Sequence, residues 1–170
     1  MRLELLAEHH LGAVAALLDD PDVLRFTRVP EPVPAGFERD WLARYEAARL
    51  DGSGEAFAAV DGNGAFLGLA LAPSIDRETG ELELGYIVAP SARGRGVATA
   101  MLSLLTEWAF ESLGAQRIVL IIDVANAASE RVARRCGYVC EGIMRSIYLK
   151  PGVRVDAGLW SRLPSDQAAS

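Results

Sequence analysis

The sequence predicts a mixed α/β fold, in which a twisted and mostly antiparallel sheet of about seven strands carries about four helices on its two faces. Short apolar or alternating runs recur along the chain between turns rich in Gly, Asp and Asn, a pattern typical of strands. Longer amphipathic stretches between some of these runs indicate helices. One apolar run leads through a glycine-rich turn into a helical pattern, which predicts a crossover to a parallel strand.

The first half of the chain is predicted to begin with a strand, because charged and apolar residues alternate over residues 2–6. Three prolines exclude regular structure over residues 28–34. The segment Asp61-Gly-Asn-Gly64 is a hairpin signal between two apolar runs. The predicted elements of this half are helices at residues 10–18 and 36–50 and strands at residues 2–6, 55–60, 65–72 and 81–88.

The second half of the chain is predicted to open with a long helix that ends near Gly114. Its apolar stripe, which we expect to pack on the sheet, consists of Val97, Met101, Leu104, Leu105 and Trp108. The next run, residues 117–123, is nearly all apolar and predicts a central strand parallel to the strand at 81–88. The remaining predicted elements are a short helix at residues 126–136 and antiparallel strands at residues 138–148 and 154–163.

Length and composition predict a single domain at residues 1–163, followed by a C-terminal tail at residues 164–170. The chain has 170 residues, of which 51% are hydrophobic, enough for one well-buried domain and too few residues for two of ordinary size. Acidic residues near the start do not fit a signal peptide, and no apolar run approaches the roughly 20 residues of a membrane span. The sequence therefore predicts a soluble, cytoplasmic protein with no membrane partner.

Charge and cysteine content narrow the possible partners. A net charge of −6 argues against a nucleic acid as the main partner, since binding to phosphates needs a basic face. A cationic small molecule or a peptide end fits this charge better. The two cysteines, Cys136 and Cys140, have no second Cys or His pair nearby in the sequence. We therefore expect reduced thiols and no metal site.

A glycine-rich turn with two arginines stands at the start of the long helix, where unpaired N–H groups and the helix dipole favour a bound phosphate. Gly94 and Gly96 leave room for a diphosphate, while Arg93 and Arg95 add charge-assisted hydrogen bonds. A Walker loop is excluded, because it needs Lys after its second Gly and Val97 stands there. A dinucleotide-binding turn and an ordinary surface turn stay open as alternatives.

Several motifs occur in a characteristic order. Arg93, Gly96 and Ala98 fit the spacing Q/R-x-x-G-x-G/A, and further motifs follow at residues 126–138 and 141–145. Together they resemble the GNAT superfamily of acyl-CoA N-acyltransferases, and the later motifs resemble its RimJ/RimL branch, which acetylates protein N-termini and related amines. The resemblance covers residues 2–163 and implies a GNAT-type fold with a splay between the fourth and fifth strands.

The resemblance also implies acetyl-CoA as co-substrate. Its diphosphate would lie on the backbone N–H groups of the glycine-rich turn, and its pantetheine arm between the strands that end at Val88 and Asp123. Asn126 would steady that arm, act only as a helix N-cap, or do both. The residues expected to contact the co-substrate are Ile87, Val88, Arg93, Gly94, Arg95, Gly96, Val97, Ala98, Thr99, Asn126 and Ser129.

Acyl transfer to an amine needs a group that accepts a proton, because alkyl amines are mostly protonated at neutral pH. The resemblance makes Glu83 the candidate base; a water chain, or a purely solvated role for Glu83, are the alternatives. A backbone N–H of Ile87 or Val88 would stabilise the charge that develops on the carbonyl oxygen. Many family members protonate the leaving thiolate with a Tyr, but the matching position is Ala133. The resemblance to the RimJ/RimL branch makes Ser129 the candidate acid; the alternative is that Ser129 only satisfies donors at the helix start beside Asn126.

The sequence identifies the acceptor only as a primary amine, on a protein or peptide N-terminus or on a small molecule. Trp41, Tyr45, Glu141 and Arg145 are the expected walls of the acceptor site. We expect direct transfer in a ternary complex; the acyl group could also be succinyl. The alternative function is an acyl-CoA sensor or partner-binding module whose catalysis has lapsed. Exposed strand edges make a homodimer possible.

Overall fold

A single sheet forms the framework of the computed structural model, which describes residues 1–150 and 152–166. The strand order is β1-β2-β3-β4-β5-β7-β6. All neighbouring strands are antiparallel except β4 and β5, which confirms the predicted mixed sheet. The strands are β1 Arg2–Leu5, β2 Glu55–Val60, β3 Phe66–Asp76, β4 Glu81–Val88, β5 Arg117–Asp123, β6 Val139–Lys150 and β7 Val153–Arg162.

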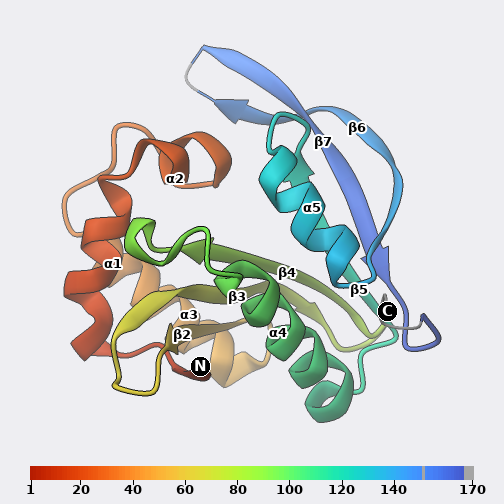
Figure 1. The fold of residues 1–170 in the computed structure, drawn as a ribbon, viewed down its shortest axis with the longest axis horizontal. Coiled ribbons are helices and arrows are strands. Elements are labelled where there is room, and N and C mark those ends of the chain that lie inside the picture. The colour runs from red at the N-terminus through yellow and green to blue at the C-terminus, as the bar shows by residue number, and fades with distance from the viewer. Residues whose placement is uncertain (151, 167–170) are drawn as a thin grey trace.

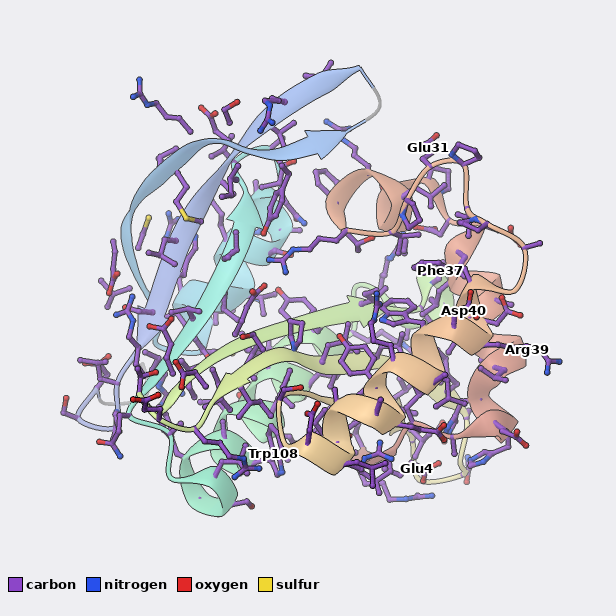
Figure 2. The ribbon with its side chains drawn as sticks, turned by 180° about the vertical axis from the view of Figure 1, so that it is seen from behind. Glu4, Glu31, Phe37, Arg39, Asp40 and Trp108 are labelled. Atoms are coloured by element: carbon purple, nitrogen blue, oxygen red, sulfur yellow. The ribbon has the colours of Figure 1, made fainter. Side chains whose placement is uncertain are left out.

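Helices cover the sheet on both faces. Figure 1 shows α4 and α5 in front of the sheet, while α3 lies behind it. Figure 2 shows the rear face, where Phe37 and Asp40 mark the first turn of α3 and none of the described helices covers β5, β6 and β7. None of the described helices is long and apolar enough to cross a membrane. The helices are α1 Leu11–Leu18, α2 Pro21–Phe26, α3 Phe37–Asp51, α4 Val97–Leu113 and α5 Ala127–Arg135.

The β4–β5 pair is short and then opens. Its register pairs Glu81, Leu82 and Glu83 with residues 117–119. Beyond Glu83 the two strands diverge, as the ribbon in Figure 1 shows, and β5 continues by pairing with β7 as far as Asp123. The side of β4 that faces β5 therefore has no strand beside it from residue 84 onward. This arrangement confirms the splay expected between the fourth and fifth strands.

The long helix α4 joins the two parallel strands and packs on the sheet. Its side toward the sheet carries the fully buried residues Met101, Leu102 and Leu105. Leu104, which the sequence placed on the same stripe, is only half-buried, and Leu102 lies inward instead. Trp108 meets the ring of Phe57 on β2 edge-on, with 5.1 Å between ring centroids.

Two elements differ from the sequence prediction. Helix α2 was not predicted, because six residues are too few for an apolar period to be seen. The signal in the sequence is an N-cap followed by a proline. The Asp20 side chain accepts a hydrogen bond from the Val23 N–H (3.0 Å), and Pro21 stands at the first helical position. Strand β3 continues past Pro73 to Asp76, because the register shifts between residues 71 and 74 and a bulge tolerates proline. Residues 167–170 of the predicted tail lie outside the described residues.

Candidate active site

The N-terminus of α4 borders the opening between β4 and β5. Gly94 and Gly96 both have a positive φ, +74° and +75°, and a Cβ built on either would meet no atom within 4 Å. Gly96 is the N-cap residue, and no side chain caps this helix end. The first N–H groups of α4 are thus left to an external acceptor, and nothing crowds their approach. The local sequence predicted this geometry.

The two arginines of the turn differ in their contacts. Arg93 turns away toward α2, where its guanidinium donates to Asp20 at 2.7 and 3.2 Å and to Asp22 at 3.2 Å. The hydrogen bond from Arg93 is the main reason that the pKa of Asp20 is lowered. Arg95 is exposed and makes no ion pair among the described residues. The structure therefore brings Arg95, but not the Arg93 side chain, to the turn as a free cation.

The open side of β4 presents backbone donors to the gap. Ala89 donates its N–H to Leu67 of β3 (2.9 Å), and donors alternate in direction along an antiparallel strand. Ile87 therefore directs its N–H toward β3, whereas Tyr86 and Val88 direct theirs toward the gap. Of the two predicted donors, the geometry favours Val88.

Helix α5 begins at the other side of the gap. The Asn126 side-chain oxygen accepts a hydrogen bond from the Ser129 N–H (3.0 Å), so Asn126 is the N-cap. Because the cap uses only the oxygen, the Asn126 amide nitrogen can still donate toward the gap. Ser129 lies on the inner face of α5, one turn before the fully buried Ala133.

Glu83 lies on the opposite face of β4 from Tyr86, since side chains alternate along a strand. Its carboxylate accepts a hydrogen bond from Arg28 at 2.5 Å, and the same guanidinium nitrogen donates to the Tyr148 hydroxyl at 2.7 Å. Burial opposes ionisation of Arg28, but the hydrogen bond with Tyr148 and the charge of Glu83 raise its pKa. Arg28 thus links β4 to the hairpin of β6 and β7 across this face.

Two of the four predicted acceptor residues lie beside Glu83. Trp41 and Tyr45 are buried on the inner side of α3, with ring centroids 6.5 Å apart. Burial is the main cause that raises the pKa of Tyr45, and the negative charge of Glu83 adds to it. An aromatic wall therefore stands next to the carboxylate.

The other two predicted acceptor residues are not brought to Glu83. Glu141 accepts a bidentate pair of hydrogen bonds from Arg117, at 2.6 and 2.7 Å, and another from Ser161 at 2.6 Å. Arg117 also binds Glu81, at the closed end of the β4–β5 pair. These bonds, above all those from Arg117, lower the pKa of Glu141 to about 2. Arg145 is exposed on β6 and makes no ion pair among the described residues.

Comparison with known proteins decides the family. Residues 1–139 match the family described as an acetyltransferase (GNAT) domain. The chain belongs to this GNAT family. The "Uncharacterized N-acetyltransferase p20" of Bacillus licheniformis is 24% identical over 88% of this chain and 84% of its own length. The "Putative ribosomal N-acetyltransferase YdaF" of Bacillus subtilis (strain 168) is 32% identical over 73% of this chain and 65% of its own length.

Solved structures share the fold of this GNAT protein. The spermidine N-acetyltransferase from Vibrio cholerae, crystallised with CoA and spermine, superposes with a TM-score of 0.86 at 22% identity and covers 97% of this chain and 96% of its own. RimL, a ribosomal L7/L12 alpha-N-protein acetyltransferase in complex with coenzyme A, also gives 0.86 at 22% identity, covering 95% of this chain and 92% of its own.

The matched family is one of acetyltransferases, for which acetyl-CoA is the expected co-substrate. The residues of this chain fit that role. The uncapped start of α4 suits the diphosphate, and the unpaired side of β4 suits an extended arm. The amide nitrogen of Asn126 is a further donor beside the gap.

Three residues at the GNAT site were missed in the sequence. Arg28 meets Glu83 and Tyr148 only through the fold, because these two partners lie 55 and 120 residues away from it in the chain. Tyr86 gave a weak signal, since strand alternation already placed it opposite Glu83. Its hydroxyl is fully buried and completes no hydrogen bond among the described residues.

One cluster outside the site has metal-ligand side chains. The ligand atoms of Glu4, His9 and His10 lie within 4.8 Å of one another. However, Nδ1 of His10 accepts a hydrogen bond from the Ala7 N–H (3.2 Å), so a neutral ring carries its proton on Nε2, 2.9 Å from Glu4. That nitrogen has no free lone pair for a metal. The contact is a hydrogen bond, and it is the main reason that the pKa of Glu4 is lowered.

Proposed function

We propose that this GNAT protein is a RimJ/RimL-like N-acetyltransferase that moves an acetyl group directly to a primary amine, on a protein or peptide N-terminus or on a small molecule. The observation that carries the proposal is the gap between β4 and β5, with Glu83 on one face and the hydroxyls of Ser129 and Tyr86 on the other. An amine and a thioester that enter from opposite faces would meet there in a ternary complex. The similarity to YdaF supports the RimJ/RimL-like branch.

In this proposal each group has one role. Glu83 accepts a proton from the acceptor ammonium, directly or through water, after the acceptor displaces Arg28 from the carboxylate. The Val88 N–H stabilises negative charge on the carbonyl oxygen. Ser129 donates to the departing sulfur. The first N–H groups of α4, Arg95 and Asn126 hold the co-substrate, which positions both reactants.

A second candidate function is an acyl-CoA sensor without turnover. Two observations favour it: Ala133 provides no acid, and Arg28 occupies the carboxylate that would serve as base. The sensor would keep the α4 site and bind CoA without consuming it.

Thiol release separates the two functions. The purified protein is incubated with acetyl-CoA or succinyl-CoA and a panel of N-terminal peptides, polyamines and aminoglycosides. The masses of the products are measured by mass spectrometry. The transferase releases CoA only when its acceptor is present and adds one acetyl group to that acceptor. Tight CoA binding without release across the panel would favour the sensor.

The homodimer also stays a proposal. Strand β6 forms one edge of the sheet, and Val139 and Ile143 on it expose 59% and 54% of their surface, an arrangement that can pair with a second copy. Light scattering after size exclusion measures the mass in solution, and a monomer at micromolar concentration would contradict this proposal.

A further inference from the structure

Tyr86 carries a buried hydroxyl that completes no hydrogen bond of normal geometry, although the Ser129 side chain lies near it. The oxygen is inaccessible to solvent and completes no hydrogen bond among the described residues. Tyr138, another buried tyrosine of the protein, binds Thr106 through its hydroxyl at 2.7 Å. An unpaired buried hydroxyl costs free energy that a phenylalanine would avoid. A tyrosine at residue 86 therefore points to a ligand that accepts its hydrogen bond.

The position of Tyr86 identifies where that ligand lies. Strand β4 loses its partner β5 after Glu83, so Tyr86 stands beside the gap. Its side chain faces α5, where Ser129 and Cys136 both influence its pKa. Ser129, Ala133 and Cys136 are spaced by four and three residues and form one stripe of the helix. The Tyr86 hydroxyl therefore lies near this stripe of α5.

We propose that Tyr86 donates its hydroxyl hydrogen to the thioester sulfur, beside Ser129, and so stabilises the thiolate as it leaves. This inference rests on the proposed function, because it requires the thioester to lie in the gap. The bond from the amine nitrogen to the carbonyl carbon forms, the carbon–sulfur bond breaks, and its electron pair stays on sulfur. The acceptor ammonium gives one proton to Glu83 or water before the attack and a second to water as the amide forms, and the thiolate takes one from water, so no further reagent is needed.

Tyr86 acts as a hydrogen-bond donor and keeps its proton. Burial raises the pKa of Tyr86 to about 12, against a smaller opposite effect of hydrogen bonding with the nearby Ser129 side chain. The phenol is therefore neutral at physiological pH and always has a hydrogen to donate. In an environment without water such a donor stabilises a developing charge more than water would.

The test measures the thiol of bound CoA without any turnover. The ultraviolet absorbance of the thiolate is titrated with pH in complexes of CoA with the wild type, Tyr86→Phe and Tyr138→Phe. We expect the pKa of the bound thiol to be higher by about one pH unit in Tyr86→Phe than in the wild type, because a hydrogen bond to a charged group is lost. Tyr138→Phe, whose hydroxyl is already paired, should match the wild type.

Thermal unfolding without CoA supplies a second readout. Tyr86→Phe removes an unpaired hydroxyl, so its Tm should equal or exceed that of the wild type, whereas Tyr138→Phe should lower it. A bound-thiol pKa unchanged in Tyr86→Phe, or a loss of Tm as large as that of Tyr138→Phe, would overturn the inference. A wild type that binds no CoA would instead overturn the proposed function and the inference with it.

Discussion

At the scale of single residues, the proposed function gives Glu83 the central role in handling the acceptor. The carboxylate is paired with Arg28, so an acceptor ammonium must replace one cation with another. This exchange makes the site responsive to acceptor charge, because a neutral amine gains nothing by displacing a guanidinium.

Replacing Glu83 by Gln should lower kcat/KM for the amine about 100-fold or more, because Gln accepts the Arg28 hydrogen bond but takes no proton. The loss should shrink above the acceptor's own pKa, about 8 for an α-amine and about 10 for an alkyl amine, where the amine arrives neutral. Rates across pH measure this. Glu81→Gln, on the same face but paired with Arg117, is the matched control, and a loss independent of pH would argue against Glu83 as the base.

The two glycine N-caps allow a comparison at equal backbone strain. Gly96 precedes α4 and Gly36 precedes α3, with φ of +75° and +77° and open space around a Cβ in both cases. Alanine at either residue should destabilise the fold by about 1 kcal/mol, because L residues disfavour this region. Only Gly96→Ala should weaken CoA binding, by about tenfold (~1.4 kcal/mol), as calorimetry can show. Equal CoA affinity in both variants would mean that the diphosphate does not approach residue 96.

At the scale of elements, the sequence predicted those whose signal is local. Strand β4 and helix α5 follow from alternation and an Asn cap, and the glycine turn follows from residues adjacent in the chain. Helix α2 was missed, and so was the contact of the Arg93 side chain with Asp20, which lies 73 residues away from it. Contacts across such distances depend on the sheet order, which one-dimensional patterns do not encode.

The ion pairs around Arg117 join β4, β5 and β6 at the closed end of the gap, and their strength depends on pH. The pKa of Glu141 is about 2 in the folded protein, below its ordinary value of 4.5. A lowered folded pKa stabilises the protein above the ordinary value, and this contribution disappears as pH falls from about 4.5 through about 2.

Glu141→Gln should therefore lower the free energy of unfolding at neutral pH by about 1 kcal/mol. The effect is smaller than for a buried ion pair, because the Glu141 side chain is 38% exposed and solvent screens its charge. The difference in the free energy of unfolding between the variant and the wild type should disappear as pH falls from 4.5 to 2. Urea unfolding at a series of pH values measures this difference. Glu107→Gln, an exposed carboxylate of α4, is the control and should show no such dependence. A constant difference at all pH values would exclude the ionised pair as the cause.

At the scale of the whole molecule, the sheet consists of two arms joined at a short parallel pair. β1 to β4 with α1 to α4 form one arm, and β5 to β7 with α5 form the other. The pairing of residues 81–83 with 117–119 is their only parallel contact within the described sheet. A ligand strand in the gap would supply the backbone partner that β4 lacks beyond Glu83, and would bind both arms at once.

CoA should therefore slow amide hydrogen exchange on both sides of the gap. At a CoA concentration of about 100 Kd, we expect the Tyr86 and Val88 amides and those at the start of α4 and α5 to exchange up to about 100-fold more slowly, because bound ligand suppresses the open state by that factor. The amides of β1, at the far edge of the sheet, should not change. Protection confined to the start of α4 would show that the diphosphate binds while the rest of the ligand lies outside the gap. In that case the two arms would move independently during catalysis, and Ser129 on α5 would have no fixed position relative to the sulfur.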